Sequence, residues 1–199
     1  MRKLSLAVVA TIFFLSGCGK FFDGPSQPKS AFVNTDITGF DQGGDFTLTD
    51  HNGKSRSLSE FKGKAVVIFF GYTQCPDVCP TTMAEMAGVM KELGPLADKV
   101  QVLFVTVDPE RDTTQLLSQY VPAFDPRFIG LTGDKEAIDK VAKQFKVFYQ
   151  KVLGKQPGTY TMDHTAGSYV LDPQGRVRLF VGMGQGVQPI VHDLKLLLS

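Results

Sequence analysis

The feature that most constrains this chain is a buried-strand pattern that leads directly to two cysteines spaced four residues apart. Residues 65–70 form an apolar run that ends at Gly71, which is typical of a strand covered on both faces. Cys75 and Cys79 follow, each with a proline directly after it. Beyond residue 80, apolar side chains recur at three- and four-residue steps, which predicts a helix. The cysteines are therefore expected where a strand meets the first turn of a helix.

This position predicts the chemistry of the two thiols. Residues four apart share one face of a helical turn, so the sulfur atoms of Cys75 and Cys79 should converge. Free N–H groups and the helix dipole favour the thiolate there, so we expect lowered cysteine pKa values. Converging thiolates can form a disulfide or hold one soft metal ion. The alternative is that both are small buried hydrophobes, but proline-flanked cysteines in a loop make poor core residues.

The N-terminal sequence predicts a leader. In residues 1–17, a basic start precedes an apolar stretch of about twelve residues, too short for a permanent membrane helix of about twenty. The end of the leader resembles a bacterial lipoprotein signal, in which Cys18 is acylated and becomes the N-terminus; an ordinary signal peptide is the alternative. Residues 18–40, rich in Gly, Pro and Ser, predict a flexible tether. Residues 41–199 are expected to form a single folded domain.

The leader also predicts the compartment. We expect the domain on the periplasmic or extracellular face of a bacterial membrane, attached through lipid. A close thiol pair is oxidised there unless it is kept reduced or bound to metal. Removing Arg2 and Lys3 from the 21 basic residues leaves 19 against 20 acidic residues, with no basic run, which argues against a nucleic-acid partner.

The hydrophobic pattern predicts an α/β fold of the thioredoxin-like sandwich class, with a central mixed sheet flanked by helices and an N-terminal hairpin. Asp112 is expected to cap a helix that begins at Thr113. The expected elements are an edge hairpin that begins at 45–49 and turns at 51–53, a helical turn at 59–63, strand 65–70, a helix ending near 93, strand 100–107, the helix from 113, strand 128–131, helix 134–145, a long loop at 150–161, a hairpin at 167–171 and 177–181, and a final helix.

The expected order of strands brings a histidine to the cysteines. The terminal hairpin should run antiparallel to the strand that precedes the cysteines, so its beginning lies beside the end of that strand. Asp163 and His164, just ahead of the hairpin, should therefore reach the same edge of the sheet as both cysteines. The loop at residues 108–112 follows a parallel strand and should reach that edge as well.

Two thiolates and one imidazole favour particular metal ions. Thiolates select Cu(I), with zinc as a competitor, and imidazole also accepts Cu(II). Structural zinc usually has four protein ligands, and only three gather here, so Cys75, Cys79 and His164 are candidate ligands of a copper ion. A site with only three protein ligands, at the edge of the sheet, is suited to passing the metal ion to another protein. Asp163 can support His164 through a hydrogen bond or lie near an open coordination position; otherwise it is a turn residue.

Three segments resemble the motifs of the Sco/SenC family. They are residues 69–80, residues 107–113, and residues 162–165 together with 169–175. The resemblance begins near Phe46 and implies a membrane-anchored, thioredoxin-like copper chaperone with Cys75, Cys79 and His164 as ligands. It also implies a role in assembling the binuclear copper centre of cytochrome c oxidase, so the expected partner is its copper-accepting subunit or another copper protein. Many relatives carry a transmembrane helix where this chain carries a lipoprotein signal. The sequence therefore does not decide whether the lipid is inserted in the inner or the outer membrane.

Two other activities remain open, so the residues do not decide whether the chain is an enzyme. Cys75 and Cys79 can act as a redox-active pair in a thiol-disulfide oxidoreductase that reduces a partner's cysteines. Against it, the spacing is C-x-x-x-C rather than C-x-x-C, and no proline lies between residues 158 and 172, where such reductases carry a cis-proline. Cys75-Pro76 also resembles the reactive cysteine of a peroxiredoxin-like peroxidase. Against this activity, such a peroxidase would lack the two other candidate ligands, Cys79 and His164.

Overall fold

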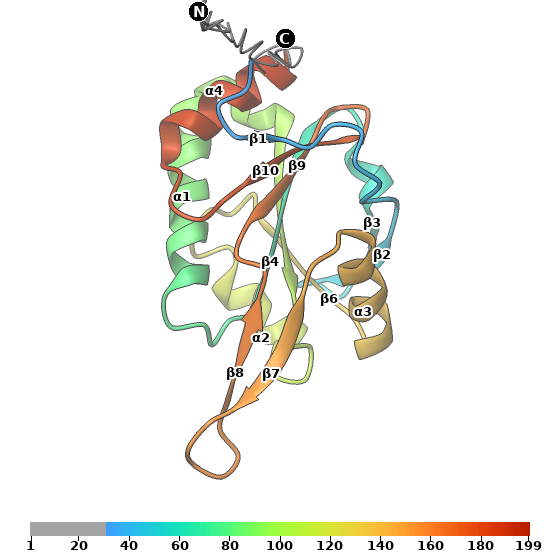
Figure 1. The fold of residues 1–199 in the computed structure, drawn as a ribbon, viewed down its shortest axis with the longest axis vertical. Coiled ribbons are helices and arrows are strands. Elements are labelled where there is room, and N and C mark those ends of the chain that lie inside the picture. Colours follow the sequence, from blue (N-terminus) through green and yellow to red (C-terminus); the bar gives the residue numbers. More distant parts are fainter. Residues whose placement is uncertain (1–30) are drawn as a thin grey trace, which may run out of the picture.

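The structure is a computed structural model that describes residues 31–199 (Figure 1). The predicted leader at 1–17, Cys18 and the first part of the predicted tether lie outside the described residues. Within 31–199, none of the helices combines the length and the apolar character that crossing a bilayer requires.

An eight-stranded mixed sheet forms the centre of the fold (Figure 1), in the strand order β1-β10-β9-β4-β5-β6-β2-β3. Three adjacent strands run parallel to one another: β4 (Ala65–Gly71), β5 (Val100–Thr106) and β6 (Ile129–Thr132). The remaining pairs are antiparallel and involve β1 (Thr35–Asp36), β2 (Thr47–Asp50), β3 (Ser55–Ser57), β9 (Ser168–Leu171) and β10 (Val177–Val181). The predicted central mixed sheet, its edge hairpin and its terminal hairpin are confirmed.

Helices flank this sheet. α1 (Val78–Leu93) packs against α4 (Val187–Leu197), and Figure 1 shows both on the side of the strands opposite α3 (Lys135–Gln144). The other helical elements are α2 (Thr114–Tyr120) and the 3-10 helices η1 (Leu58–Phe61) and η2 (Gly94–Lys99). Because β4-α1-β5 and β5-α2-β6 join parallel strands, they are the crossover units that parallel pairing requires.

The core lies where β4 and β5 meet the helices. Every residue of these two strands is buried, which explains their continuous apolar sequences. α1 buries Met83, Met86 and Met90, at helical spacing, to 1% exposure or less. Burying such a side chain stabilises the fold by about 1.5–3 kcal/mol, so these methionines serve packing.

A separate two-stranded sheet replaces an expected loop. β7 (Tyr149–Leu153) and β8 (Tyr160–His164) pair antiparallel, and Figure 1 shows them projecting from the end of the molecule away from α4. The loop predicted over 150–161 is therefore wrong. Of the residues in both strands, only Met162 is buried, so the segment carries almost none of the hydrophobic alternation from which a strand is recognised.

The flexible tether predicted over 18–40 is wrong for its last part. β1 pairs with β10, and the residues just before β1 are held by α4. The buried carboxylate of Asp193 accepts hydrogen bonds from the backbone N–H groups of Val33 and Asn34, both at 2.8 Å. Hydrogen bonds to a charged acceptor are among the stronger ones, so this contact fixes a segment whose composition alone suggests flexibility.

Asp112 does not cap α2, which corrects a second prediction. The N-cap is Thr113, whose hydroxyl accepts the N–H of Leu116 at 3.2 Å. Asp112 is fully buried and accepts hydrogen bonds from the Thr73 N–H at 3.0 Å, the Thr73 hydroxyl at 2.6 Å and the Thr106 hydroxyl at 2.6 Å. A buried carboxylate needs such partners, and these three donors tie the loop after β4 to the end of β5.

Candidate metal centre

The strand register brings the candidate ligands to one edge of the sheet. β9 runs antiparallel to β4, with Ser168 opposite Phe69. The chain ahead of β9 therefore passes the carboxyl end of β4, where the cysteine loop begins, and β8 ends there at His164. The predicted antiparallel pairing is confirmed, and so is the convergence that it implies.

Cys75, Cys79 and His164 form a compact cluster, in which the three donor atoms all lie within 4.8 Å of one another. The Sγ atom of Cys79 is 3.5 Å from Nε2 of His164, and the Cys79 N–H donates to Sγ of Cys75 at 3.4 Å. Both cysteines have free thiols. Within the described part of the chain, this is the one group of three or more Cys, His, Asp or Glu side chains arranged to hold a metal ion.

A glycine at the end of β4 makes room for the inner thiol. α1 begins at Val78, so Cys79 lies in its first turn, while Cys75 lies in the loop ahead of it. A Cβ atom on Gly71 would come within 2.9 Å of Sγ of Cys79 and 2.8 Å of the Phe69 ring. The absence of a side chain at Gly71 therefore lets the Cys79 sulfur lie directly over the end of the strand.

The two cysteines differ in exposure. Cys79 is fully buried and Cys75 is partly exposed. Burial raises the pKa of the Cys79 thiol far above its usual value, and the nearby Cys75 sulfur and Asp112 carboxylate raise that pKa further. The expectation of a lowered pKa is therefore wrong for Cys79, because desolvation of the thiolate outweighs the favourable helix N-terminus. A metal ion bound here must displace the Cys79 proton.

His164 presents one nitrogen to the cysteines. Its Nδ1 lies 3.0 Å from the Thr165 carbonyl oxygen, which can only accept, so Nδ1 carries the hydrogen and Nε2 is left for the cluster. Burial lowers the pKa of His164, which favours the neutral, ligating form. The rings of Phe69 and Tyr72 approach the imidazole edge-on, with centroids 6.1 and 6.0 Å away. The sequence analysis did not identify these aromatic contacts.

Asp163 makes no hydrogen bond to His164, which corrects one of the roles expected of it. Successive side chains of a strand point to opposite faces, so Asp163 of β8 is exposed on the outer face while His164 turns inward. The Thr165 carbonyl takes the hydrogen-bonding role that was expected of its carboxylate. Asp163 acts on His164 only through its charge, which raises the histidine pKa and partly opposes the effect of burial.

The fold and the cluster together define a class of protein. It consists of thioredoxin-like domains in which a C-x-x-x-C loop and a distant histidine meet at the carboxyl-terminal edge of the central strands. Within that class, this chain belongs to the SCO1/SenC family, whose family model matches residues 34–199.

Similar proteins support this assignment. A SCO2-like protein of Rickettsia felis is 35% identical over 201 residues, which cover 98% of this chain and 98% of that protein. The structure of Bradyrhizobium japonicum ScoI with copper bound is 45% identical, with a TM-score of 0.74, and covers 79% of this chain and 99% of that one. The apo Sco1 structure from Thermus thermophilus is 39% identical, with a TM-score of 0.76, and covers 86% of this chain and all of its own.

Proposed function

We propose that this chain is a copper chaperone that binds Cu(I) or Cu(II) through Cys75, Cys79 and His164. Its recipient would be the binuclear copper centre of cytochrome c oxidase during assembly of that enzyme. The observation that carries the proposal is the convergence of two sulfur atoms and one imidazole nitrogen within 4.8 Å. Membership of the SCO1/SenC family and the copper bound by the related ScoI support it.

The donor set suits capture and release of copper. Thiolates favour Cu(I), and the imidazole makes Cu(II) acceptable as well. Binding at Cys79 releases its proton, whereas Nε2 of His164 is already free to coordinate. Cys75 is partly exposed, so a ligand of the recipient can approach the ion from its side while Cys79 still holds it. Handover then proceeds by exchange of one ligand at a time.

We also propose that Cys18 is acylated and anchors the domain to the periplasmic or extracellular face of a bacterial membrane. The segments of this proposal are a leader at 1–17, a tether that begins at residue 18 and ends before the contact between Val33 and Asp193, and the folded domain. The lipoprotein-like sequence before Cys18 supports it. Figure 1 shows that the described chain begins beside the end of α4, at the end of the molecule opposite β7 and β8. The tether would therefore join the domain at the end remote from the β7–β8 hairpin.

A second candidate function is thiol-disulfide exchange, which the unequal exposure of the cysteines favours. Cys75 is accessible and accepts the Cys79 N–H, whereas Cys79 is buried beside it. The Cys75 thiolate would attack a partner's disulfide and form a mixed disulfide, releasing one partner thiol. The Cys79 thiolate would then form the Cys75–Cys79 disulfide and release the other. The partner gains two electrons and two protons, and this chain loses them.

Anaerobic copper titration of the purified reduced protein tests the main proposal. We expect one copper ion per chain, with absorbance in the thiolate-to-Cu(II) charge-transfer region when Cu(II) is added. Cys75→Ser or Cys79→Ser should abolish tight binding and that absorbance. Tight Cu(I) binding by the double variant would contradict the proposed ligands. Reduction of a model disulfide by the metal-free protein tests the second candidate, and peroxide turnover is the control for a peroxidase.

A further inference from the structure

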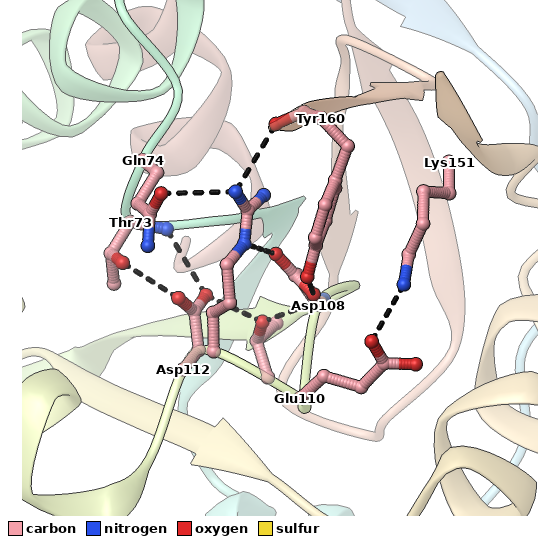
Figure 2. A network of polar contacts seen from close by, with 9 residues as sticks. Thr73, Gln74, Asp108, Glu110, Asp112, Lys151 and Tyr160 are labelled. Atoms are coloured by element: carbon pink, nitrogen blue, oxygen red, sulfur yellow. Dashed lines mark hydrogen bonds and ion pairs between the residues drawn. The ribbon is translucent and has the colours of Figure 1, made fainter. Parts of the chain in front are cut away.

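Arg111 joins the segments that carry the metal cluster (Figure 2). Its Nη1 donates to the side-chain oxygen of Gln74 at 2.9 Å and to the backbone oxygen of Tyr160 at 3.1 Å, and its Nε donates to Asp108. Gln74 is the residue before Cys75, and Tyr160 is the first residue of β8, which ends at His164. One guanidinium therefore connects the cysteine loop to the histidine strand.

The environment of Arg111 makes this connection well defined. Its guanidinium carbon lies 3.5 Å from the centroid of the Tyr160 ring, and the Tyr160 hydroxyl donates to Asp108 at 2.9 Å. Asp108 is 2% exposed, and the Arg111 side chain is 20% exposed. Partly buried charges are screened less than surface charges, and a planar guanidinium can stack and hydrogen-bond at once. Arg111, Asp108 and Tyr160 therefore form a connected polar unit, which we call the arginine clamp, although Nη2 of Arg111 is buried without a hydrogen-bond partner.

The hairpin of β7 and β8 needs such an attachment. It is a two-stranded sheet of its own and shares no ladder with the eight-stranded sheet. A hairpin of two strands is marginally stable in water, and only Met162 of its strand residues is buried. The hairpin is instead attached through side-chain contacts, which include the clamp at Tyr160, the Tyr149 hydroxyl on Asp139 and the packing of the His164 ring against Phe69 and Tyr72.

The cysteine loop has supports besides its contact between Arg111 and Gln74. Asp112 accepts both the N–H and the hydroxyl of Thr73, and the Cys75 N–H donates to the Tyr72 carbonyl at 3.3 Å. Cys79 is fixed in the first turn of α1. Loss of the clamp should therefore loosen β8, and with it His164, more than it loosens the two cysteines.

We propose that Arg111 is a positioning residue that holds His164 within reach of an ion bound by Cys75 and Cys79. This inference rests on the proposed copper site. Imidazole matters more to Cu(II) than to Cu(I), because two thiolates alone satisfy the softer ion. Loss of the clamp therefore changes the preference between the two oxidation states, whereas loss of a positive charge near the cluster would weaken both.

Arg111→Lys is the decisive variant, because it keeps the charge but cannot bridge Gln74, Asp108 and the Tyr160 carbonyl together. We expect Cu(II) affinity to fall about 10- to 100-fold, as for other residues that orient a metal ligand, and Cu(I) affinity to stay within about threefold. Tyr160→Ala, which removes the stacking surface at a partly exposed position, should produce the same split and serves as a second variant if Arg111→Lys folds poorly. Arg127→Lys is the matched control, since Arg127 makes the same kind of arginine–aspartate contact with Asp125, but in the loop before β6 and outside the hairpin and the cysteine loop.

The experiment has a metal-free arm and a copper arm. In the metal-free protein, hydrogen exchange of the β8 amides should become faster in Arg111→Lys and stay unchanged in Arg127→Lys. Chelator competition then gives the Cu(I) and Cu(II) affinities. Unchanged exchange with unchanged Cu(II) affinity overturns the proposal, and so do equal losses for both ions. If the unmodified protein bound no copper, the proposed function would fail, and β8 exchange alone would decide whether Arg111 positions the strand.

Discussion

Gly71→Ala should disturb the metal cluster through a single added methyl group. A Cβ atom at this position would meet three side-chain atoms: Cε1 of Phe69 at 2.8 Å, Sγ of Cys79 at 2.9 Å and Cε2 of Phe104 at 3.0 Å. All three side chains are fully buried, so none can swing into solvent. The methyl group must be accommodated by moving at least one of them.

The magnitude follows from two opposing effects. Replacing glycine by alanine in an extended strand stabilises a protein by about 0.4–1 kcal/mol, because the unfolded chain loses freedom. Overpacking a tightly filled core costs about 1–3 kcal/mol, and three contacts at or below 3.0 Å place Gly71→Ala at the upper end of that range. The net loss is then about 2–2.6 kcal/mol, which lowers the Tm of a domain of this size by about 4–10 °C.

The functional effect should exceed the effect on stability. Cys79 contacts both the added methyl group and His164, whose Nε2 is 3.5 Å from its sulfur, so displacement of Sγ changes the geometry of the cluster. We expect weaker copper binding in a protein that is still folded at 25 °C. Thermal denaturation followed by circular dichroism measures the first effect, and chelator competition measures the second.

Gly182→Ala is the control for this experiment. Its added Cβ would meet only the end of the flexible Gln185 side chain, at 3.4 Å, and surface changes of this kind stay within about 0.5 kcal/mol. A Gly71→Ala protein with the Tm and the copper affinity of the unmodified chain would refute the reasoning, because it would mean that the core around Cys79 is loosely packed.

Three further predictions concern the ligands and the N-terminal segment. His164→Ala should weaken Cu(II) more than Cu(I), since imidazole is the harder ligand, and equal losses would count against its assignment. Copper affinity should fall on acidification from about pH 8 to 5, by up to about tenfold per pH unit for each displaced proton, because thiols and imidazole recover their protons; a flat profile would exclude these ligands. Asp193→Ala should destabilise the domain by about 2–4 kcal/mol, seen as a lower Tm, because it leaves the N–H groups of Val33 and Asn34 unpaired. The pKa of Asp193 is lowered, so its contribution is present above about pH 4 and is lost as the pH falls through the folded-state pKa; a Tm equal to that of the unmodified protein would argue against this role.

Local patterns predicted the elements that carry the cysteines. The apolar run of β4 and the periodicity of α1 are each determined by neighbouring residues, so strand, loop and helix could be assigned without coordinates. The β7–β8 hairpin could not be assigned, because its strands expose nearly all their residues and contact residues distant in the sequence, such as Arg111 and Asp139. The N-terminal segment was misassigned for the same reason, since its partner Asp193 is about 160 residues away.

The meeting of the ligands was predictable from the residues alone, because the expected strand order and the antiparallel terminal hairpin bring His164 to Cys75 and Cys79. The protonation and orientation of each group, in contrast, depend on the folded surroundings. Burial, which depends on every surrounding element, raises the pKa of Cys79 against the pull of the helix terminus. Strand alternation turns Asp163 outward and leaves the Thr165 carbonyl to orient the imidazole. Sequence patterns thus predict which residues are ligands. Their protonation states and the orientation of their side chains depend on desolvation and on contacts between distant segments.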